Sequence, residues 1–334
     1  MKQPKVSVIV PVYNVQECLP KCIDSLLGQD FEGIEIVLIN DGATDSSGAI
    51  CDTYAHKYSN IRVIHQKNAG VSAARNTGLK NVTAPYVFFL DSDDFIAHDM
   101  ISRLYVHMTE KNCDIAMGEM KEWRSPNDIR ELKKRFDKET VLLDDDIIST
   151  FLSSRLGFSN VCSCMFRTEM LAGVSFNTNI SIGEDAVFLW EILKKSKCVV
   201  VDPLAIYYYY MRPGSAVNSG FNAKHVNIME WNVNLPKEIK LLHPKHFNAA
   251  LMKAVHGHIT ILNLIALSVS VEKKYIEQIL STLRPMIKEY WRIANNNMLR
   301  RSLVVLCAYA FPIYRIIYRT YMSIKMRGLI KPNE

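Results

Sequence analysis

The chain has 334 residues and a mass of 38.1 kDa, with 49% hydrophobic and 22% charged residues. This composition is typical of globular proteins and excludes a fibrous, disordered or disulfide-scaffold chain. The formal net charge is +6, and residues 301–334 supply +5 of it, because they contain six basic residues and one acidic residue. The first 300 residues therefore carry only +1, which does not favour a basic surface for nucleic acid.

The sequence shows no sign of export. The eight cysteines are scattered, with no C-x-x-C pair and no metal-ligand spacing, so we expect reduced thiols. The apolar stretch Val6–Val12 is too short for the core of a signal peptide. No uninterrupted apolar run reaches the roughly 18–20 residues that a spanning helix needs, and the nearest is 303–314. These observations predict a cytoplasmic protein.

Short apolar segments alternate with helical segments along residues 1–120, which predicts a parallel sheet with helices on its faces. We expect strands at 6–10, 34–39, 61–64 and 86–90, and helices at 17–27, 45–58 and 71–79. In such sheets, ligands bind beyond the carboxyl ends of the strands. The residues that follow each strand are therefore the ones expected to carry chemistry.

The pattern is less regular from 120 to 216 and then becomes helical. We expect an edge strand or loop near 141–143, helices at 145–155 and 185–195, and strands at 161–166 and 205–210. Amphipathic helical stretches follow at 223–242, 245–269, 272–296 and 299–326. The predicted organisation is an α/β domain at 1–216 and a helical region at 217–334, with a basic amphipathic end at about 300–331.

Polar clusters follow three of the expected strands: PVYN at 11–14, NDGATD at 40–45 and DSDD at 91–94. A turn followed by a helix cap at Asp45 would explain the second cluster without any function. The third is harder to explain, because crowded carboxylates repel one another unless a cation neutralises them. Asp91 and Asp93 are two residues apart and can face one divalent ion such as Mg²⁺ or Mn²⁺.

Two common phosphate-binding motifs are missing from the sequence. There is no G-x-G-x-x-G after the first strand and no G-x-x-x-x-G-K-[ST] anywhere. A dinucleotide-binding dehydrogenase and a P-loop ATPase are therefore disfavoured. A sheet with carboxylates at its edge suits a ligand whose phosphates are held through a metal.

Taken in order, the motifs resemble those of the family 2 nucleotide-sugar-dependent glycosyltransferases. They are VIVPVYN at 8–14, NDGATD at 40–45, NAGVSAARN at 68–76, DSDD at 91–94 and GED at 183–185. Ala43 stands where the family often has Ser. The resemblance implies a GT-A fold: an α/β, Rossmann-like, mainly parallel sheet with helices on both faces, followed by a helical C-terminal region that the motifs do not reach.

The resemblance implies that the uracil base of a UDP-sugar donor is bound by Pro11, Val12, Tyr13 and Asp41. A carboxylate at Asp41 can accept a hydrogen bond from the uracil N3–H, which cytosine lacks. Tyr13 offers the face or edge of its ring to the base. The donor is therefore expected to be a UDP-sugar.

The resemblance also places Asp91 near the ribose or sugar, puts Ser92 at the donor, and makes Asp93 a ligand of Mn²⁺ or Mg²⁺. Such an ion bridges the two phosphates and stabilises the charge that develops on the departing UDP. Arg75 has two interpretations of equal weight: a guanidinium beside the donor, or a structural ion pair with an aspartate at the sheet edge.

Arg212 and Ser215 follow the last expected strand. They look like the Arg and Ser that fold a loop over the donor pyrophosphate in related enzymes, where a planar guanidinium suits the geometry. The tyrosines at 208–210 are interpreted as packing on alternate faces of the strand, with a sugar-stacking platform as the alternative.

Inverting sugar transfer also needs a base, because the acceptor hydroxyl must lose its proton as it attacks. The family match assigns this role to Asp185, and Glu184 then orients or binds the acceptor, although the two roles are open to exchange. A carboxylate at the start of a helix can also be a simple cap.

The basic end at about 300–331 alternates apolar stretches with basic and aromatic residues. It can lie in a membrane interface on anionic headgroups, or it can be a terminal helix packed on the catalytic domain. The first alternative adds a peripheral position on the inner face of the plasma membrane to the cytoplasmic expectation.

The sequence therefore predicts an inverting hexosyl- or N-acetylhexosaminyltransferase. Its acceptor is expected to be a glycan hydroxyl, on a lipid-linked oligosaccharide in surface polysaccharide synthesis. The alternatives are the same chemistry on a protein or glycoprotein, and a non-catalytic nucleotide-binding protein of the same fold. The carboxylates Asp93 and Asp185 favour catalysis.

Overall fold

The computed structural model describes residues 3–131, 136–153, 160–211, 220–293 and 298–326. The chain forms two compact units, which are Met1–Thr178 with Gly183–Pro213, and Asn179–Ile182 with Gly214–Glu334. The predicted boundary at 216 falls within 212–219, outside the described residues.

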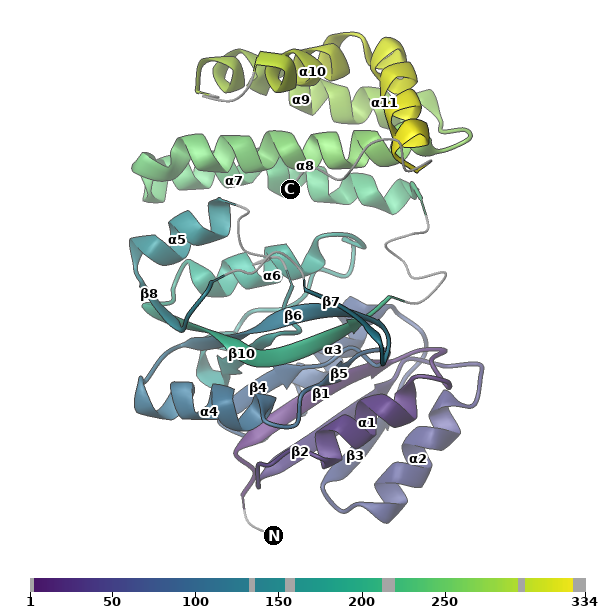
Figure 1. The fold of residues 1–334 in the computed structure, drawn as a ribbon, viewed down its shortest axis with the longest axis vertical. Coiled ribbons are helices and arrows are strands. Elements are labelled where there is room, and N and C mark those ends of the chain that lie inside the picture. The colour runs from purple at the N-terminus through teal and green to yellow at the C-terminus, as the bar shows by residue number, and fades with distance from the viewer. Residues whose placement is uncertain (1–2, 132–135, 154–159, 212–219, 294–297, 327–334) are drawn as a thin grey trace. The chain divides into compact units, whose positions relative to one another are not determined.

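The first unit is a mixed sheet with helices on both sides (Figure 1). Its described strands are β1 Val6–Val12, β2 Ile34–Asn40, β3 Ile61–His65, β4 Tyr86–Phe89, β5 Phe95–Ile96, β6 Ile115–Ser125, β7 Asp128–Glu131, β8 Thr140–Leu143, β9 Cys164–Arg167 and β10 Cys198–Tyr210. Its described helices are α1 Leu19–Leu27, α2 Ser47–Lys57, α3 Val71–Leu79, α4 Met100–Glu110, α5 Asp145–Leu152 and α6 Glu184–Leu193. The strand order is β3-β2-β1-β4-β9-β6-β10-β5, with β7 on β6 and β8 on β10. The predicted α/β fold with helices on both faces is confirmed.

Strands β1 and β2 are buried along their whole length, as expected for parallel strands covered on both faces. Strand β1 pairs in parallel with β2 and β4, so the three carboxyl ends meet at one edge. Helix α3 packs closely on this part of the sheet, because a Cβ at Gly78 would lie only 2.4 Å from Ile9 Cγ2. The edge that carries the predicted site is therefore held by a dense core.

Helix α4 and strand β6 were not predicted, and the predicted strand at 205–210 covers only the second half of β10. The register of β10 against β6 shifts between Val201 and Ile206, where Asp202 and Pro203 interrupt the ladder. Proline cannot donate to a ladder and is tolerated at such irregularities. The first half of β10 was therefore not predicted, because the strand continues past Pro203.

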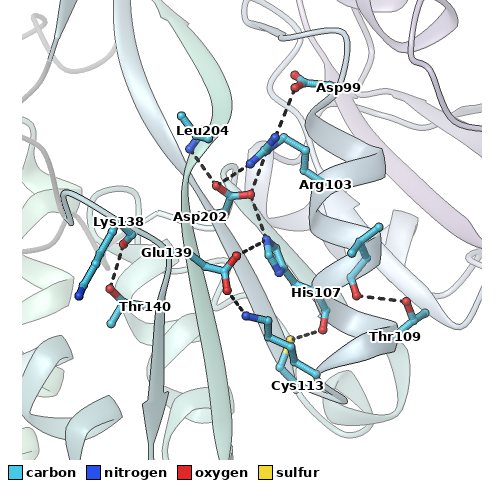
Figure 2. Close-up of polar contacts among 12 residues, drawn as sticks. Asp99, Arg103, His107, Thr109, Cys113, Lys138, Glu139, Thr140, Asp202 and Leu204 are labelled. Atoms are coloured by element: carbon cyan, nitrogen blue, oxygen red, sulfur yellow. Dashed lines mark hydrogen bonds and ion pairs between the residues drawn. The ribbon is translucent and has the colours of Figure 1, made fainter.

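A buried carboxylate ties α4 to this irregular part of β10 (Figure 2). Asp202 accepts hydrogen bonds from Arg103 Nε at 2.9 Å and Nη2 at 3.2 Å, and from Leu204 N at 2.9 Å. His107 Nε2 lies 3.0 Å from the same carboxylate. Burial works against the charge, yet the hydrogen bonds and Arg103 lower the pKa of Asp202 below its ordinary value. An ionised aspartate therefore fixes α4 on the sheet.

The second unit is helical in the part that the structure describes. Its elements are the 3₁₀ turns η3 Ala223–Ile228 and η4 Pro244–His246 and the helices α7 Met229–Leu242, α8 Phe247–Leu267, α9 Lys273–Ile293, α10 Met298–Tyr309 and α11 Phe311–Met326. The predicted helix at 299–326 is therefore two helices. Pro312 lacks an N–H for Ala308 O, which accepts from Arg284 Nε at 3.0 Å instead.

Two arginines of the basic end are bound inside the second unit. Arg315 Nη2 donates to Ser268 O at 2.7 Å, and Arg319 Nε donates to Ala266 O at 2.5 Å. They satisfy carbonyls at the end of α8, where the helix dipole favours cations. Ile313 and Ile316 of α11 are exposed, and Ile316 keeps 68% of its surface.

One segment of the described chain, Pro244–Leu267, is long and apolar enough to cross a membrane by length and composition, with a mean hydropathy of 1.4. Half of the apolar window is buried inside the protein, and a buried core helix meets the same criterion. The prediction concerned uninterrupted apolar runs, and this helix does not contradict it, because Lys253 and the histidines interrupt its apolar residues. The helix meets the criterion by its mean hydropathy instead.

Candidate functional site

The first predicted segment ends β1. Pro11 and Val12 are buried within the strand, and Val12 O accepts a hydrogen bond from Asp41 N at 2.9 Å. Tyr13 directly follows the strand, and 46% of its surface is exposed. The Tyr13 ring is therefore the side chain of this segment that a planar ligand can contact.

Asp41 follows β2 and is almost fully buried, with 2% of its surface exposed. One carboxylate oxygen accepts from Gln66 Nε2 at 2.7 Å and Ala69 N at 2.9 Å, and the other accepts from Gly70 N at 2.8 Å. A carboxylate has about four acceptor directions, so one is left for a further donor such as a base N–H. Asp41 also holds the loop before α3, a role that the sequence did not reveal.

Arg75 of α3 lies at the centre of an acidic cluster, with only 3% of its side chain exposed. Its Nη1 is 2.6 Å from Asp185 Oδ1 and 3.6 Å from Glu184 Oε1, and its Nη2 is 2.8 Å from Asp91 Oδ1. Of the two interpretations of Arg75, the structure shows the ion pair. The guanidinium joins the predicted base to the acidic segment after β4.

Helix α3 presents Arg75 through contacts with the segment around Phe176. Asn76 Nδ2 donates to Phe176 O at 2.9 Å, and Phe176 N donates to Asn76 Oδ1 at 2.8 Å. The Arg75 guanidinium lies 5.2 Å from the Phe176 ring, a cation–π distance. Phe176 stacks at 3.8 Å on Phe188 of α6. The Arg-Asn pair therefore links α3 to the helix that carries Asp185.

Asp185 has an unusual protonation equilibrium. Burial raises its pKa to about 7, Arg75 works in the opposite direction, and Glu184 and Asp91 raise it further. Its second oxygen accepts from Val161 N at 3.3 Å. The carboxyl group therefore gains and loses its proton near neutral pH, as an efficient general base requires.

The start of α6 explains how two acidic residues come to lie there. Gly183, with φ of 80°, precedes the helix, and Glu184 and Asp185 occupy its first turn. The helix dipole favours carboxylates at this end. The residue at the N-cap position is Gly183, which has no side chain to cap the helix. The Asp185 carboxylate contacts Arg75 and the backbone N–H of Val161. A simple cap therefore does not account for Asp185.

The acidic segment after β4 is clamped to β10 by Tyr207, which the sequence did not single out, and by the backbone of Tyr210. Tyr207 OH donates to Asp94 Oδ2 at 2.6 Å and accepts from Asp91 N at 3.3 Å. Tyr210 N donates to Asp94 Oδ1 at 2.7 Å. Tyr207 and Asp94 are both buried. The sequence predicted only that the tyrosines at 208–210 pack on alternate faces of the strand.

The segment carries excess negative charge, which bears on the implied metal. Burial and the charges of Asp93 and Asp91 raise the pKa of Asp94 well above its ordinary value. A divalent cation would relieve this repulsion. No group of three or more His, Cys, Asp or Glu among the described residues is arranged to hold a metal alone. The crowded carboxylates of this segment therefore fit a divalent cation by their charge.

Ser92 is buried beside these aspartates, with 6% of its surface exposed. The structure therefore brings together residues from the ends of β1, β2 and β4, helix α3 and the start of α6. Arg212 and Ser215 lie outside the described residues.

A sheet of this order, with an acidic segment after β4 and a carboxylate pair at the start of α6, defines a GT-A type glycosyltransferase fold. The family model described as "Glycosyl transferase family 2" matches residues 7–175. The chain belongs to this family, as the motifs predicted.

Curated relatives match part of the chain. The chain is 33% identical over 219 residues to "Glycosyltransferase GlyA" of Streptococcus pneumoniae, covering 63% of this chain and 31% of that protein. It is 31% identical over 214 residues to "Poly(ribitol-phosphate) beta-glucosyltransferase" of Bacillus spizizenii, covering 62% and 32%. The chain thus spans about a third of the length of these relatives.

Among solved structures, S. aureus TarS 1-349 in complex with UDP-GlcNAc has a TM-score of 0.73 and 23% sequence identity. The match covers 99% of this chain and 94% of that one. At this identity the likeness establishes the fold alone. It extends to the helical second unit, which the family model does not reach.

Proposed function

We propose that the chain is an inverting glycosyltransferase that moves a sugar from a UDP-sugar to a hydroxyl group of a glycan. The observation that carries this proposal is Asp185, a carboxyl with 14% of its side chain exposed, which Arg75 joins to the acidic segment after β4 and whose pKa is raised to about 7 by desolvation. The name "Poly(ribitol-phosphate) beta-glucosyltransferase" of one relative supports sugar transfer to a polymer, and the UDP-GlcNAc complex of TarS supports a UDP-linked donor.

The donor lies over the carboxyl ends of β1, β2 and β4 in this proposal. Tyr13 contacts the base, and Asp41 accepts from the uracil N3–H in its remaining acceptor direction. Asp93 would hold Mn²⁺ or Mg²⁺ at this edge of the sheet. When bound, the ion supplies Lewis-acid stabilisation of the negative charge on the leaving UDP.

Asp185 removes the proton of the acceptor hydroxyl as the hydroxyl oxygen attacks the anomeric carbon. The bond from that carbon to the phosphate oxygen breaks, UDP leaves with the electron pair, and the anomeric configuration inverts. Glu184 orients the acceptor. Arg75 keeps Asp185 in place and limits the rise of its pKa, so that a large fraction is ionised at neutral pH.

UDP release from a panel of UDP-hexoses and UDP-N-acetylhexosamines, with Mn²⁺ and a glycan acceptor, tests this function. Replacement of a general base or of a metal-binding carboxylate should reduce turnover by about 10²–10⁴-fold. We expect losses of this size for Asp185→Asn and Asp93→Asn. Asp128→Asn, in an exposed pair with Arg130, is the matched control.

Unchanged turnover in Asp185→Asn would refute the base, and no UDP release from any donor would refute the transferase. The stereochemistry of the product tests inversion. Thermal stabilisation by GDP or CMP but not by UDP would refute the role of Asp41 in choosing uracil.

The acceptor is proposed to be lipid-linked, with the protein at the inner face of the plasma membrane. Ile313, Ile316 and Ile317 form an exposed apolar stripe on α11 and support this location. Because Arg315 and Arg319 bind carbonyls of α8, the apolar stripe rather than these cations would meet the lipid.

Sedimentation with vesicles of phosphatidylcholine and phosphatidylglycerol tests the location. Ile316→Glu should weaken vesicle binding about tenfold, because a charge replaces an apolar side chain that would be buried in the lipid. Leu241→Glu, at an exposed position of α7, is the control. Equal binding of both variants would count against the membrane role of α11.

A further inference from the structure

Buried polar atoms without hydrogen-bond partners gather where three helices of the second unit meet. Helix α10 packs against both α9 and α8 (Figure 1). His256 Nε2 of α8, Tyr290 OH of α9 and Arg301 Nε of α10 are each buried and have no hydrogen-bond partner among the residues that the structure describes. The rings of His256 and Tyr290 are 6.2 Å apart, and Tyr290 is 0% exposed. Because unmet buried polar groups are costly, such a group of atoms points to a missing ligand.

The charge around these atoms is positive. Arg300 and Arg301 stand in the first turn of α10, which holds no acidic residue. Cations are unfavourable at this end, because the helix dipole is positive there. Helices α8, α10 and α11 contain no Asp or Glu in their sequences, and α9 contains Glu277, which pairs with Arg284, and Glu289. Among the described residues, no carboxylate forms an ion pair with Arg300 or Arg301. An anion would satisfy both arginines and the helix end.

The cluster reaches solvent on one side. Arg300 is exposed, and the Arg301 guanidinium lies 5.9 Å from the ring of Trp291, which is 39% exposed. Burial raises the pKa of Tyr290, whereas the charges of Arg300 and Arg301 oppose the rise. Burial and Arg300 lower the pKa of His256 to about 4. At neutral pH the phenol and the uncharged imidazole can therefore both donate hydrogen bonds beside two guanidinium groups.

We propose that His256, Tyr290, Arg300 and Arg301 form a binding site for a phosphate-type oxyanion in the second unit. The phenol O–H and the imidazole N–H donate to oxygens on the inner side, and the two guanidinium groups supply charge and further donors. Two positive charges match a phosphate monoester dianion. The N-terminus of α10 adds its dipole. The phosphate belongs either to a small soluble molecule or to a lipid headgroup, and this site does not depend on the transferase chemistry.

Titration calorimetry of the full chain with inorganic phosphate, at constant ionic strength in chloride, measures the site. Arg301→Gln should weaken phosphate binding about tenfold and Tyr290→Phe several-fold, because each removes a donor to the anion. Arg292→Gln, which removes an exposed charge of α9, is the matched control and should bind as the parent chain does. Equal phosphate affinity in all three variants would overturn the proposal.

Tyr290→Phe also guards against an effect of misfolding. If the hydroxyl is only an unsatisfied group, its removal leaves stability unchanged or raised and leaves phosphate binding unaltered, and the proposal fails. If it is a ligand, the variant stays folded in the absence of phosphate but loses most of the rise in melting temperature that phosphate gives.

Vesicles distinguish the two sources of phosphate. Phosphatidylcholine vesicles with phosphatidic acid are compared with phosphatidylcholine alone, in the parent chain and in Arg301→Gln. Binding that needs phosphatidic acid and Arg301 assigns the site to a headgroup, whereas binding of inorganic phosphate alone assigns it to a soluble ligand. Absence of both kinds of binding would overturn the proposal. Vesicle binding by Ile316→Glu, which alters the apolar stripe of α11 and leaves the four residues of this site intact, separates the contribution of the site from that of the stripe.

Discussion

Two arginines of the first unit bind aspartates that are partly buried at Arg75 and fully buried at Arg103, and the balance of charge differs between the two places. Arg75 is shared among Asp185, Asp91 and Glu184, and burial raises the pKa of Asp185 to about 7. Around Asp202 the balance is reversed. One carboxylate accepts hydrogen bonds from Arg103 and from Leu204 N, and His107 lies beside it. The pKa of Asp202 is lowered although burial opposes this.

The difference shows how the same residue types serve stability in one place and reactivity in another. A carboxylate with enough donors stays ionised and holds two elements together, as Asp202 holds α4 to β10 (Figure 2). A carboxylate that competes for one cation keeps a proton near neutral pH, which is useful for catalysis and unfavourable for folding. Four changes test this comparison.

The largest effect is expected for Arg75→Gln. Removing the guanidinium leaves several carboxylates buried without a cation, and breaking a buried ion pair in this way costs about 3–5 kcal/mol. Urea denaturation should show this loss of unfolding free energy, and UDP release should be abolished. Arg130→Gln removes a half-exposed ion pair and should cost under about 1 kcal/mol. Similar losses in the two variants would contradict the central role of Arg75.

Asp202→Asn should cost about 2–3 kcal/mol, because hydrogen bonds to a charged acceptor are worth about 1.5–3 kcal/mol. The ionised carboxylate stabilises the fold above its ordinary pKa of 3.8, and this contribution is lost as the pH falls through the lower folded value. The gap between parent and variant should therefore narrow below about pH 4. Denaturation curves at pH 7 and pH 3 measure it, and a constant gap would show that the charge of Asp202 is unimportant.

Tyr207→Phe should reduce kcat/KM about tenfold with a stability loss of about 1 kcal/mol, because one buried hydrogen bond to Asp94 is removed. The acidic segment then loses its clamp, so the KM for the UDP-sugar should rise more than kcat falls. Tyr208→Phe is the control, since its ring stacks on Phe95 at 4.8 Å. Steady-state kinetics that are equal for both variants would rule out a positioning role for Tyr207.

Glu184→Gln should move the rising limb of the pH–rate profile to lower pH by less than about one unit, because Glu184 helps to raise the pKa of Asp185. The sign for stability follows from the raised pKa. The protonated form of Asp185 contributes stability below its ordinary pKa of 3.8, and this is lost as the pH rises through about 7. The variant should lose less stability over this range. A profile that does not move, or moves upward, would contradict the assignment.

Much of the fold could be predicted because it depends on local patterns. Continuous apolar runs marked β1, β2 and β4, and helical spacing marked α3 at its observed bounds. Pro312 also indicates the break between α10 and α11, which the prediction of a single helix at 299–326 did not include. The first half of β10 was not predicted. Pro203 suggests the end of a strand when the pairing of β10 with β6 is not known.

The sequence by itself determined the family, the mixed α/β architecture and the acidic residues gathered at one edge of the sheet, because these follow from motif order and from the direction of parallel strands. Only the tertiary structure decided how the charges are shared. It joined Arg75 to Asp185 across 110 positions of chain and Tyr207 to Asp94 across 113. Burial and the number of neighbouring charges set each pKa, and neither can be read from local spacing. The same holds for Tyr290 and Arg301, whose polar atoms are buried without partners only after helices α8, α9 and α10 have packed.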